Sequence, residues 1–159
     1  EEVHGFSLEK LYELSEGMEF LDQLQDFMKD FFDADFVIGH NVQFDIKFLK
    51  HELNSLYEVG MIDETWEPKN SFCTMAYYKN ICNIPAPRGN GIKNPKLSEV
   101  IDFLNISQDK IATKANELFQ GSGNYHDARF DTAAAYLLVI EGIKQKYIKP
   151  GFFSEQLKK

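Results

Sequence analysis

Two short strand-like segments, each followed by a helical pattern, predict a mixed α/β protein. Residues 35–41 form a short apolar run that ends in glycine, which is typical of a buried strand leading into a turn. A second short strand is expected at residues 71–74, followed by a helix through Tyr77 and Tyr78. A strand–turn–helix unit of this kind is typical of α/β folds. After the first segment, apolar side chains recur at helical spacing, at Phe44, Phe48, Leu49, Leu53 and Leu56.

The remaining pattern predicts further helices joined by loops. Loops are expected where proline, glycine and asparagine gather, at residues 60–70, 83–96 and 121–124. Ser7 and Asp127 are the expected N-caps of the first and last helices. The helices are expected at residues 8–14, 18–32, 97–104 and 127–146. We therefore predict one domain over residues 1–148 and a tail at 149–159.

Composition indicates a soluble globular protein and excludes several other classes. The 159 residues are 43% hydrophobic and 26% charged, which is the balance of a packed domain. No apolar run reaches the roughly 18–20 residues of a membrane span, so no membrane partner is expected. The net charge of −8 argues against a protein that coats nucleic acid with a basic face, but not against a nuclease that uses metal ions. Cys73 and Cys82 give no disulfide framework, so a reducing, cytoplasmic location is expected.

Three residues are candidates for catalysis because of their places in the predicted elements. Asp45 lies in the first turn of a helix just after a strand, where open α/β sheets bind ligands. Asp131 lies inside the last long helix beside alanines, so its carboxylate is expected near a buried face, where it needs a partner or a metal. His126 lies in the loop before that helix. Taken singly, Asp45 also fits a residue that complements the helix dipole, and His126 fits a surface loop residue.

Two segments together resemble the motifs of the DEDDh family of 3′–5′ exonucleases. The first is residues 40–49, with the pattern H-N-x-x-F-D-x-x-F-L, and the second is residues 126–131, with the pattern H-x-A-x-x-D. Residues 3–7 are similar to a V-H-G-[IL]-[ST] segment of the family, and residues 72–75 and 95–100 fit its middle region. The chain is most similar to the branch with the epsilon proofreading subunits of bacterial DNA polymerase III and their stand-alone relatives.

The resemblance implies a ribonuclease H-like fold with three layers, α/β/α, and hydrolysis of phosphodiester bonds at DNA 3′ ends. It implies two divalent ions, Mg²⁺ or Mn²⁺, bound by Asp45 and Asp131. Such ions activate water and stabilise the leaving oxygen. His126 is then the general base. The residues that the resemblance assigns to binding of the terminal nucleotide are His4, Asn41 and Phe44.

The chain departs from the family near its start. The family carries two further carboxylates in a D-x-E motif on its first strand, and no D-x-E lies on an apolar strand here. The chain begins at Glu1 rather than at a methionine. We therefore expect a fragment that lacks the first three strands of the fold and is inactive alone, while the longer protein is the exonuclease.

Two alternatives stay open beside a DNA exonuclease. The H-x-A-x-x-D-T pattern ending at Thr132 also occurs in RNase T-like enzymes that trim RNA 3′ ends. The missing D-x-E favours instead a catalytically dead domain that serves as a scaffold or binding module. The expected partner is a nucleic-acid 3′ end, foremost of single-stranded DNA, and the resemblance allows a polymerase partner. Arg88, Lys93 and Lys96 either contact nucleic acid or belong to a solvated loop.

Overall fold

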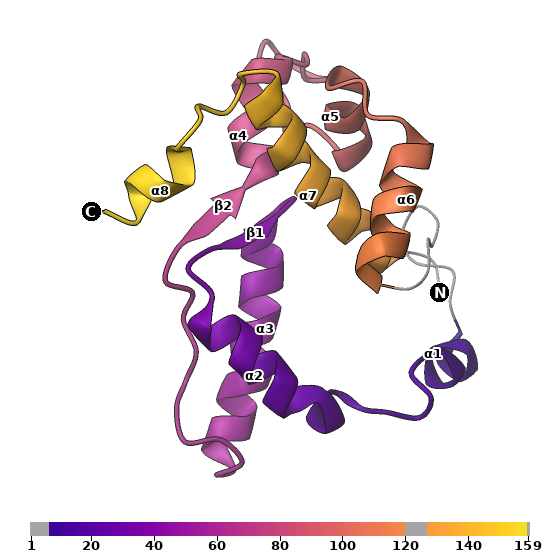
Figure 1. Cartoon of the computed structure of the whole chain (residues 1–159), viewed down its shortest axis with the longest axis vertical. Helices are drawn as coiled ribbons and strands as arrows, with labels where there is room; N and C mark the ends of the chain where they lie inside the picture. Colours follow the sequence, from indigo (N-terminus) through magenta and orange to yellow (C-terminus); the bar gives the residue numbers. More distant parts are fainter. Residues whose placement is uncertain (1–6, 120–126, 159) are drawn as a thin grey trace.

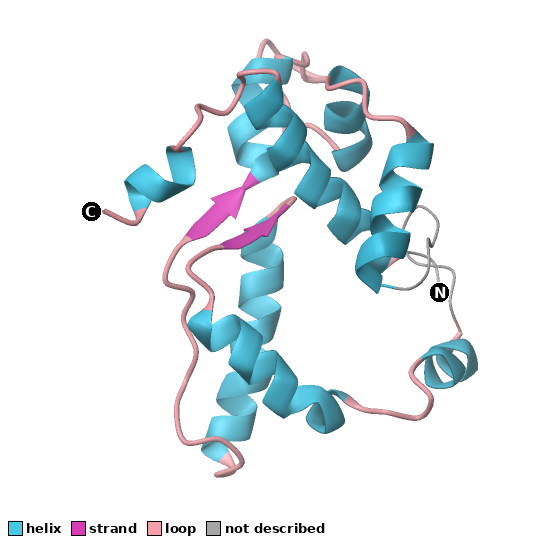
Figure 2. Ribbon diagram, in the orientation of Figure 1, coloured by secondary structure: helices cyan, strands magenta, loops and turns pink. Residues whose placement is uncertain are grey.

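The computed structural model describes residues 7–119 and 127–158. These residues form helices and two short strands (Figures 1 and 2). None of the helices in this part of the chain is both long enough and apolar enough to cross a membrane. In chain order the elements are α1 (Leu8–Leu14), the 3₁₀ helix η1 (Phe20–Gln23), α2 (Leu24–Asp33), β1 (Val37–Gly39), α3 (Val42–Glu58), β2 (Ser71–Cys73), α4 (Thr74–Cys82), α5 (Leu97–Phe103), α6 (Gln108–Phe119), α7 (Ala128–Lys144) and α8 (Phe152–Gln156).

β1 and β2 form a parallel sheet in the middle of the molecule, with α3 as the connection between them (Figure 2). Ile38 is paired with Phe72, and the Val37 N–H donates to the Asn70 carbonyl at 3.0 Å. In a parallel ladder of this register, Val37 and Gly39 bond toward β2, so the N–H and C=O of Ile38 point to the opposite edge. Within residues 7–119 and 127–158 no strand pairs with that edge.

Helices α4 to α7 enclose a tightly packed core. Tyr78 of α4, Ile101 of α5, Ile111 of α6 and Leu138 of α7 are all fully buried in it. The Tyr78 hydroxyl donates to the Leu138 carbonyl oxygen at 2.9 Å. Gly142 permits this approach, because a Cβ at that position would lie 2.1 Å from Tyr78 Oη. The core side of α7 is therefore held closely against α4.

A second core joins α2 to α3 around Trp66, which lies in the connection from α3 to β2. The Trp66 indole N–H donates to the Phe31 carbonyl at 3.1 Å, and the two rings meet edge to face. Leu53 of α3 is fully buried in the same cluster. In Figure 1, α2 and α3 extend to the opposite end of the molecule from α4 and α5, with the sheet between the two ends.

The segment expected to be a tail instead forms α8. Gly151 precedes this helix with a φ of 83°, a left-handed conformation that glycine adopts at little cost. The rings of Phe152 and Phe153 lie 5.4 and 5.1 Å from the ring of Phe72 in β2. Residues after Pro150 therefore pack against the sheet.

The structure confirms a mixed α/β protein and most of the predicted helices. Both expected caps form: Ser7 Oγ accepts the Lys10 N–H at 3.1 Å, and Asp127 Oδ1 accepts the Arg129 N–H at 2.9 Å. The helix predicted over residues 18–32 is split into η1 and α2, and α6 was not predicted. Among the described residues the sheet has two strands, so the three-layer ribonuclease H-like architecture stays a prediction.

Candidate functional site

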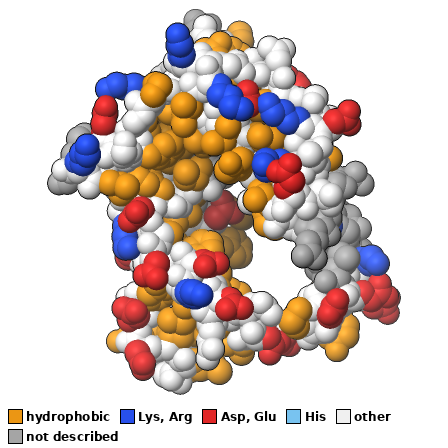
Figure 3. Space-filling view, in the orientation of Figure 1, with side chains coloured by type: hydrophobic (Ala, Val, Ile, Leu, Met, Phe, Trp, Pro, Cys, Tyr) orange, Lys and Arg blue, Asp and Glu red, His pale blue; other side chains and the backbone are white. Residues whose placement is uncertain are grey.

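A cavity of about 920 Å³ lies where the carboxyl end of β1 meets α7. It lies between α7 and α2, where the space-filling view shows a hollow in the surface (Figure 3). Most of its wall is apolar and comes from β1, α2, α3, α7 and α8. Its lining residues with polar side chains are His40, Asp45, Asp131, Thr132 and Tyr136. The carboxyl ends of strands are the usual place for ligands in open α/β sheets.

Asp45 reaches this cavity from the first turn of α3. The chain turns between β1 and α3 because Asn41 adopts a left-handed φ of 71°, which asparagine tolerates better than most residues. The carboxylate lies close to the end of β1, since a Cβ on Gly39 would be 3.5 Å from Asp45 Oδ2. Partial burial raises the pKa of the Asp45 carboxyl, and its own backbone N–H opposes that rise. A carboxylate in this environment gains stability from a bound cation.

Asp131 reaches the same cavity from the first turn of α7. The start of α7 is fixed by Asp127, whose carboxylate caps the helix and pairs with the Arg129 guanidinium at 2.7 Å. The Asp131 side chain is half-buried, and Ala135, one turn further along α7, is buried and lines the cavity as well. The expectation that Asp131 lies near a buried face is confirmed.

His40 joins three segments at the edge of the cavity. Its Nε2–H donates to the Pro95 carbonyl oxygen at 3.0 Å, because that oxygen can only accept. The Thr74 hydroxyl lies 3.1 Å from His40 Nδ1 and 3.2 Å from the Gly39 carbonyl oxygen. When the imidazole is neutral and protonated on Nε2, both Nδ1 and the Gly39 carbonyl oxygen can accept the one hydroxyl proton of Thr74. Burial lowers the pKa of His40, although the Pro95 carbonyl and the charge of Asp131 act in the opposite direction. His40 lies in the first motif, but its contacts to Thr74 and Pro95 are non-local and could not be found from the sequence.

The two expected nucleotide-binding residues at the start of α3, Asn41 and Phe44, lie near the cavity but are not among the residues that line it. Asn41 is exposed and directly precedes α3. Phe44 is 58% exposed, and its ring lies 5.0 Å from that of Phe48, which is 55% exposed. The structure therefore places an exposed aromatic pair next to Asp45.

Two other expected site residues, His4 and His126, lie outside the residues that the structure describes. Within residues 7–119 and 127–158, no group of three or more His, Cys, Asp or Glu side chains is arranged to hold a metal ion. The cavity brings together two carboxylates from distant segments, Asp45 and Asp131. Two carboxylates offer hard oxygen ligands of the kind that Mg²⁺ and Mn²⁺ prefer.

Comparisons of the chain with protein-family models, with curated proteins and with solved structures find no match.

Proposed function

We propose that this chain is part of a metal-dependent 3′–5′ exonuclease with a ribonuclease H-like fold, acting on the 3′ ends of nucleic acid. One observation supports the proposal above the others. Asp45 and Asp131 belong to two separate segments that resemble nuclease motifs, and both line one cavity at the carboxyl end of β1. A packing role for either residue alone gives no reason for both carboxylates to line the same mostly apolar cavity.

The residues of this cavity offer the right kind of ligand atom for a divalent ion, but fewer ligands than two ions need. Asp45 and Asp131 supply carboxylate oxygens, and partial burial, which raises the pKa of Asp45, disfavours its charge when no cation is bound. When bound at such sites, divalent ions lower the pKa of water and offset negative charge on a phosphodiester. Two carboxylates serve one ion rather than two, so a two-ion site needs oxygen ligands beyond those that the described residues bring to the cavity.

The open edge of β1 offers a place for the other ligands. The N–H and C=O of Ile38 point away from β2 toward that edge, and Ile38 itself lines the cavity. A strand added there would complete these hydrogen bonds and place its own side chains near Asp45. In our proposal this strand carries the D-x-E motif that the resemblance requires. His126 accepts the proton of the attacking water, and His4, Asn41 and Phe44 hold the terminal nucleotide.

The test of this function is a nuclease assay on the whole natural protein that contains the chain. We expect Mg²⁺-dependent release of mononucleotides from the 3′ end of single-stranded DNA, with Asp131→Asn lowering the rate by at least about a hundredfold. The matched control is Asp109→Asn, which changes an aspartate in the first turn of α6 instead of α7. An RNA oligonucleotide in the same assay separates DNA degradation from RNA trimming. Equal rates for the two aspartate variants would contradict the proposal.

A catalytically dead binding domain is the second candidate function. It is favoured by the lack of a D-x-E motif on an apolar strand of this sequence. This candidate predicts that the whole natural protein binds single-stranded DNA without degrading it, with or without Mg²⁺. The same assay, read for binding as well as for release of mononucleotides, separates the two functions.

A further inference from the structure

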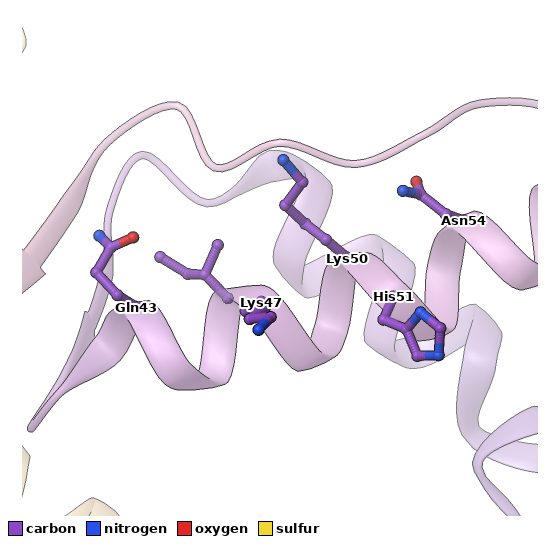
Figure 4. A pocket seen from close by; sticks show the side chains of 6 residues that line it. Gln43, Lys47, Lys50, His51 and Asn54 are labelled. Carbon is purple, nitrogen blue, oxygen red and sulfur yellow. The ribbon is translucent and has the colours of Figure 1, made fainter.

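A groove of about 410 Å³ runs along α3, away from the cavity that holds Asp45. Its polar lining consists of side chains that donate hydrogen bonds through nitrogen, and the buried Ile46 lines it as well. No carboxylate is among the described residues that line it. Figure 4 shows the labelled side chains as a row along one helix. We call this row the α3 stripe, and its members are Gln43, Lys47, Lys50, His51 and Asn54.

The α3 stripe is suited to an extended anion because of its length. From Gln43 to Asn54 it covers three turns, or about 16 Å at 1.5 Å per residue. Each donor has another donor three or four residues away, so the five side chains share one side of the helix. A compact anion reaches only one or two of these groups, whereas a chain of phosphates can contact each turn in succession.

The charge of the stripe contrasts with that of the whole chain. The chain has a net charge of −8, yet the groove is lined by two lysines and a histidine. Two existing interactions involve the stripe: the ammonium of Lys50 pairs with Glu67, and Gln43 Nε2 donates to Ser71 Oγ at 3.3 Å. Both are solvent-exposed, so they cost little to exchange for contacts with a ligand.

We propose that the α3 stripe binds the sugar–phosphate backbone of single-stranded DNA. This inference rests on the proposed function and names a second contact for the same substrate. Phe44 and Phe48 are exposed on α3. Around the helix axis, they lie between the side that carries the stripe and the side that carries Asp45. They supply ring faces on which bases can stack as the strand passes from the stripe toward the cavity.

The experiment measures fluorescence anisotropy of a labelled deoxythymidine oligonucleotide in EDTA, where metal-dependent cleavage and metal binding play no part. The stripe variant is Lys47→Gln/Lys50→Gln. The control variant, Lys29→Gln/Lys158→Gln, removes the same charge from two exposed lysines away from α3, one in α2 and one after α8. We expect the stripe variant to weaken binding about tenfold at low salt and the control less than twofold. The slope of log affinity against log salt should fall by about 1.4 in the stripe variant, at about 0.7 for each lost phosphate contact.

Several results would overturn the inference. They are equal weakening in the two variants, no binding by the wild-type chain at low salt, or competition by thymidine monophosphate as strong as by the oligonucleotide, which would indicate a site for a compact anion. Loss of nuclease activity in Asp131→Asn with unchanged oligonucleotide binding in EDTA would leave both proposals standing. If the stripe variant binds the oligonucleotide as tightly as the wild type, while Asp131→Asn loses nuclease activity, this inference is rejected and the proposed function is not.

Discussion

The core between α4 and α7 is closed, whereas the face of the molecule around β1 is open. Tyr78, Ile101 and Leu138 have no exposed surface in the first region. In the second, Ile38 is 39% exposed and Phe44 more so, and a large cavity lies beside them. α7 belongs to both regions, since Leu138 faces the core and Asp131 faces the cavity. Charged ligands can therefore be held on one side of a helix whose other side is fixed by packing.

The largest expected effect comes from adding one methyl group to the closed region, at Gly142 of α7. Gly142→Ala places a Cβ 2.1 Å from Tyr78 Oη and 3.0 Å from Ile148 Cδ1, and we expect it to lower the free energy of unfolding by about 1–3 kcal/mol or more. The change outweighs the better helix propensity of alanine, which is about 0.5–1 kcal/mol. Urea denaturation measures the difference. Gly91→Ala is the control, because a Cβ there meets no atom within 4 Å.

The hydroxyl of Tyr78 makes this prediction sharper. Tyr78→Phe removes the atom that blocks Gly142, so the double variant Tyr78→Phe/Gly142→Ala should be more stable than Gly142→Ala alone. Rescue should be partial, because the contact with Ile148 persists. If Tyr78→Phe gives no relief, the closed packing of α7 against α4 is wrong.

A glycine-to-alanine substitution on the open face, at Gly39, should lower the free energy of unfolding less than Gly142→Ala does. It should also disturb the neighbouring Asp45. A Cβ on Gly39 would lie 3.3 Å from the Val42 side chain and 3.5 Å from Asp45 Oδ2, distances that small shifts into the cavity can relieve. We expect Gly39→Ala to change the free energy of unfolding by less than about 1 kcal/mol. It should also alter the NMR signals of Asp45 more than those of Asp102, an exposed aspartate of α5. A loss as large as that of Gly142→Ala would remove the contrast between the two regions.

The smallest expected effect is a pH dependence due to His40. Burial lowers the pKa of His40 below its ordinary value of 6.5, so the unfolded chain binds a proton at higher pH than the folded chain. The stability that depends on neutral His40 is therefore complete above about pH 6.5 and is lost as the pH falls toward the folded pKa. We expect no more than about 1 kcal/mol, because the ring is partly solvated. Urea denaturation from pH 7.5 to pH 5.5 should show a steeper loss in the wild-type chain than in His40→Gln, and identical slopes would contradict this role.

The sequence was a good guide to the elements whose signals are local. The apolar run ending at Gly39 predicted β1, and Ser7 and Asp127 cap the helices that they were expected to cap. α6 was overlooked although Ile111 and Ala115 are spaced one turn apart and buried, because most of its other residues are polar. The Pro150–Gly151 pair predicts a chain stop, whereas in the structure Gly151 precedes α8, a place where glycine is less common than after a helix.

The site could be predicted only as separate candidates. Asp45 and Asp131 were proposed from their motifs, but their common cavity depends on how α7 packs against β1. His40 shows the limit most clearly, since its partners Thr74 and Pro95 are brought to it by α4 and by the loop before α5. The α3 stripe needed the structure as well, because the groove beside these side chains and the contacts of Gln43 with Ser71 and of Lys50 with Glu67 are non-local.

The central claim is that Asp45 and Asp131 together bind a divalent ion. The most direct measurement is titration of the ¹⁵N-labelled chain with Mn²⁺, read as paramagnetic broadening of amide signals. We predict saturable broadening first at Gly39 and Thr132, beside the two carboxylates, and its loss in Asp45→Asn/Asp131→Asn. Asp45→Asn should not unfold the chain, because the raised pKa of Asp45 means that its charge disfavours the folded state at neutral pH. Broadening that is spread over the acidic surface and unchanged by the double variant would contradict the claim.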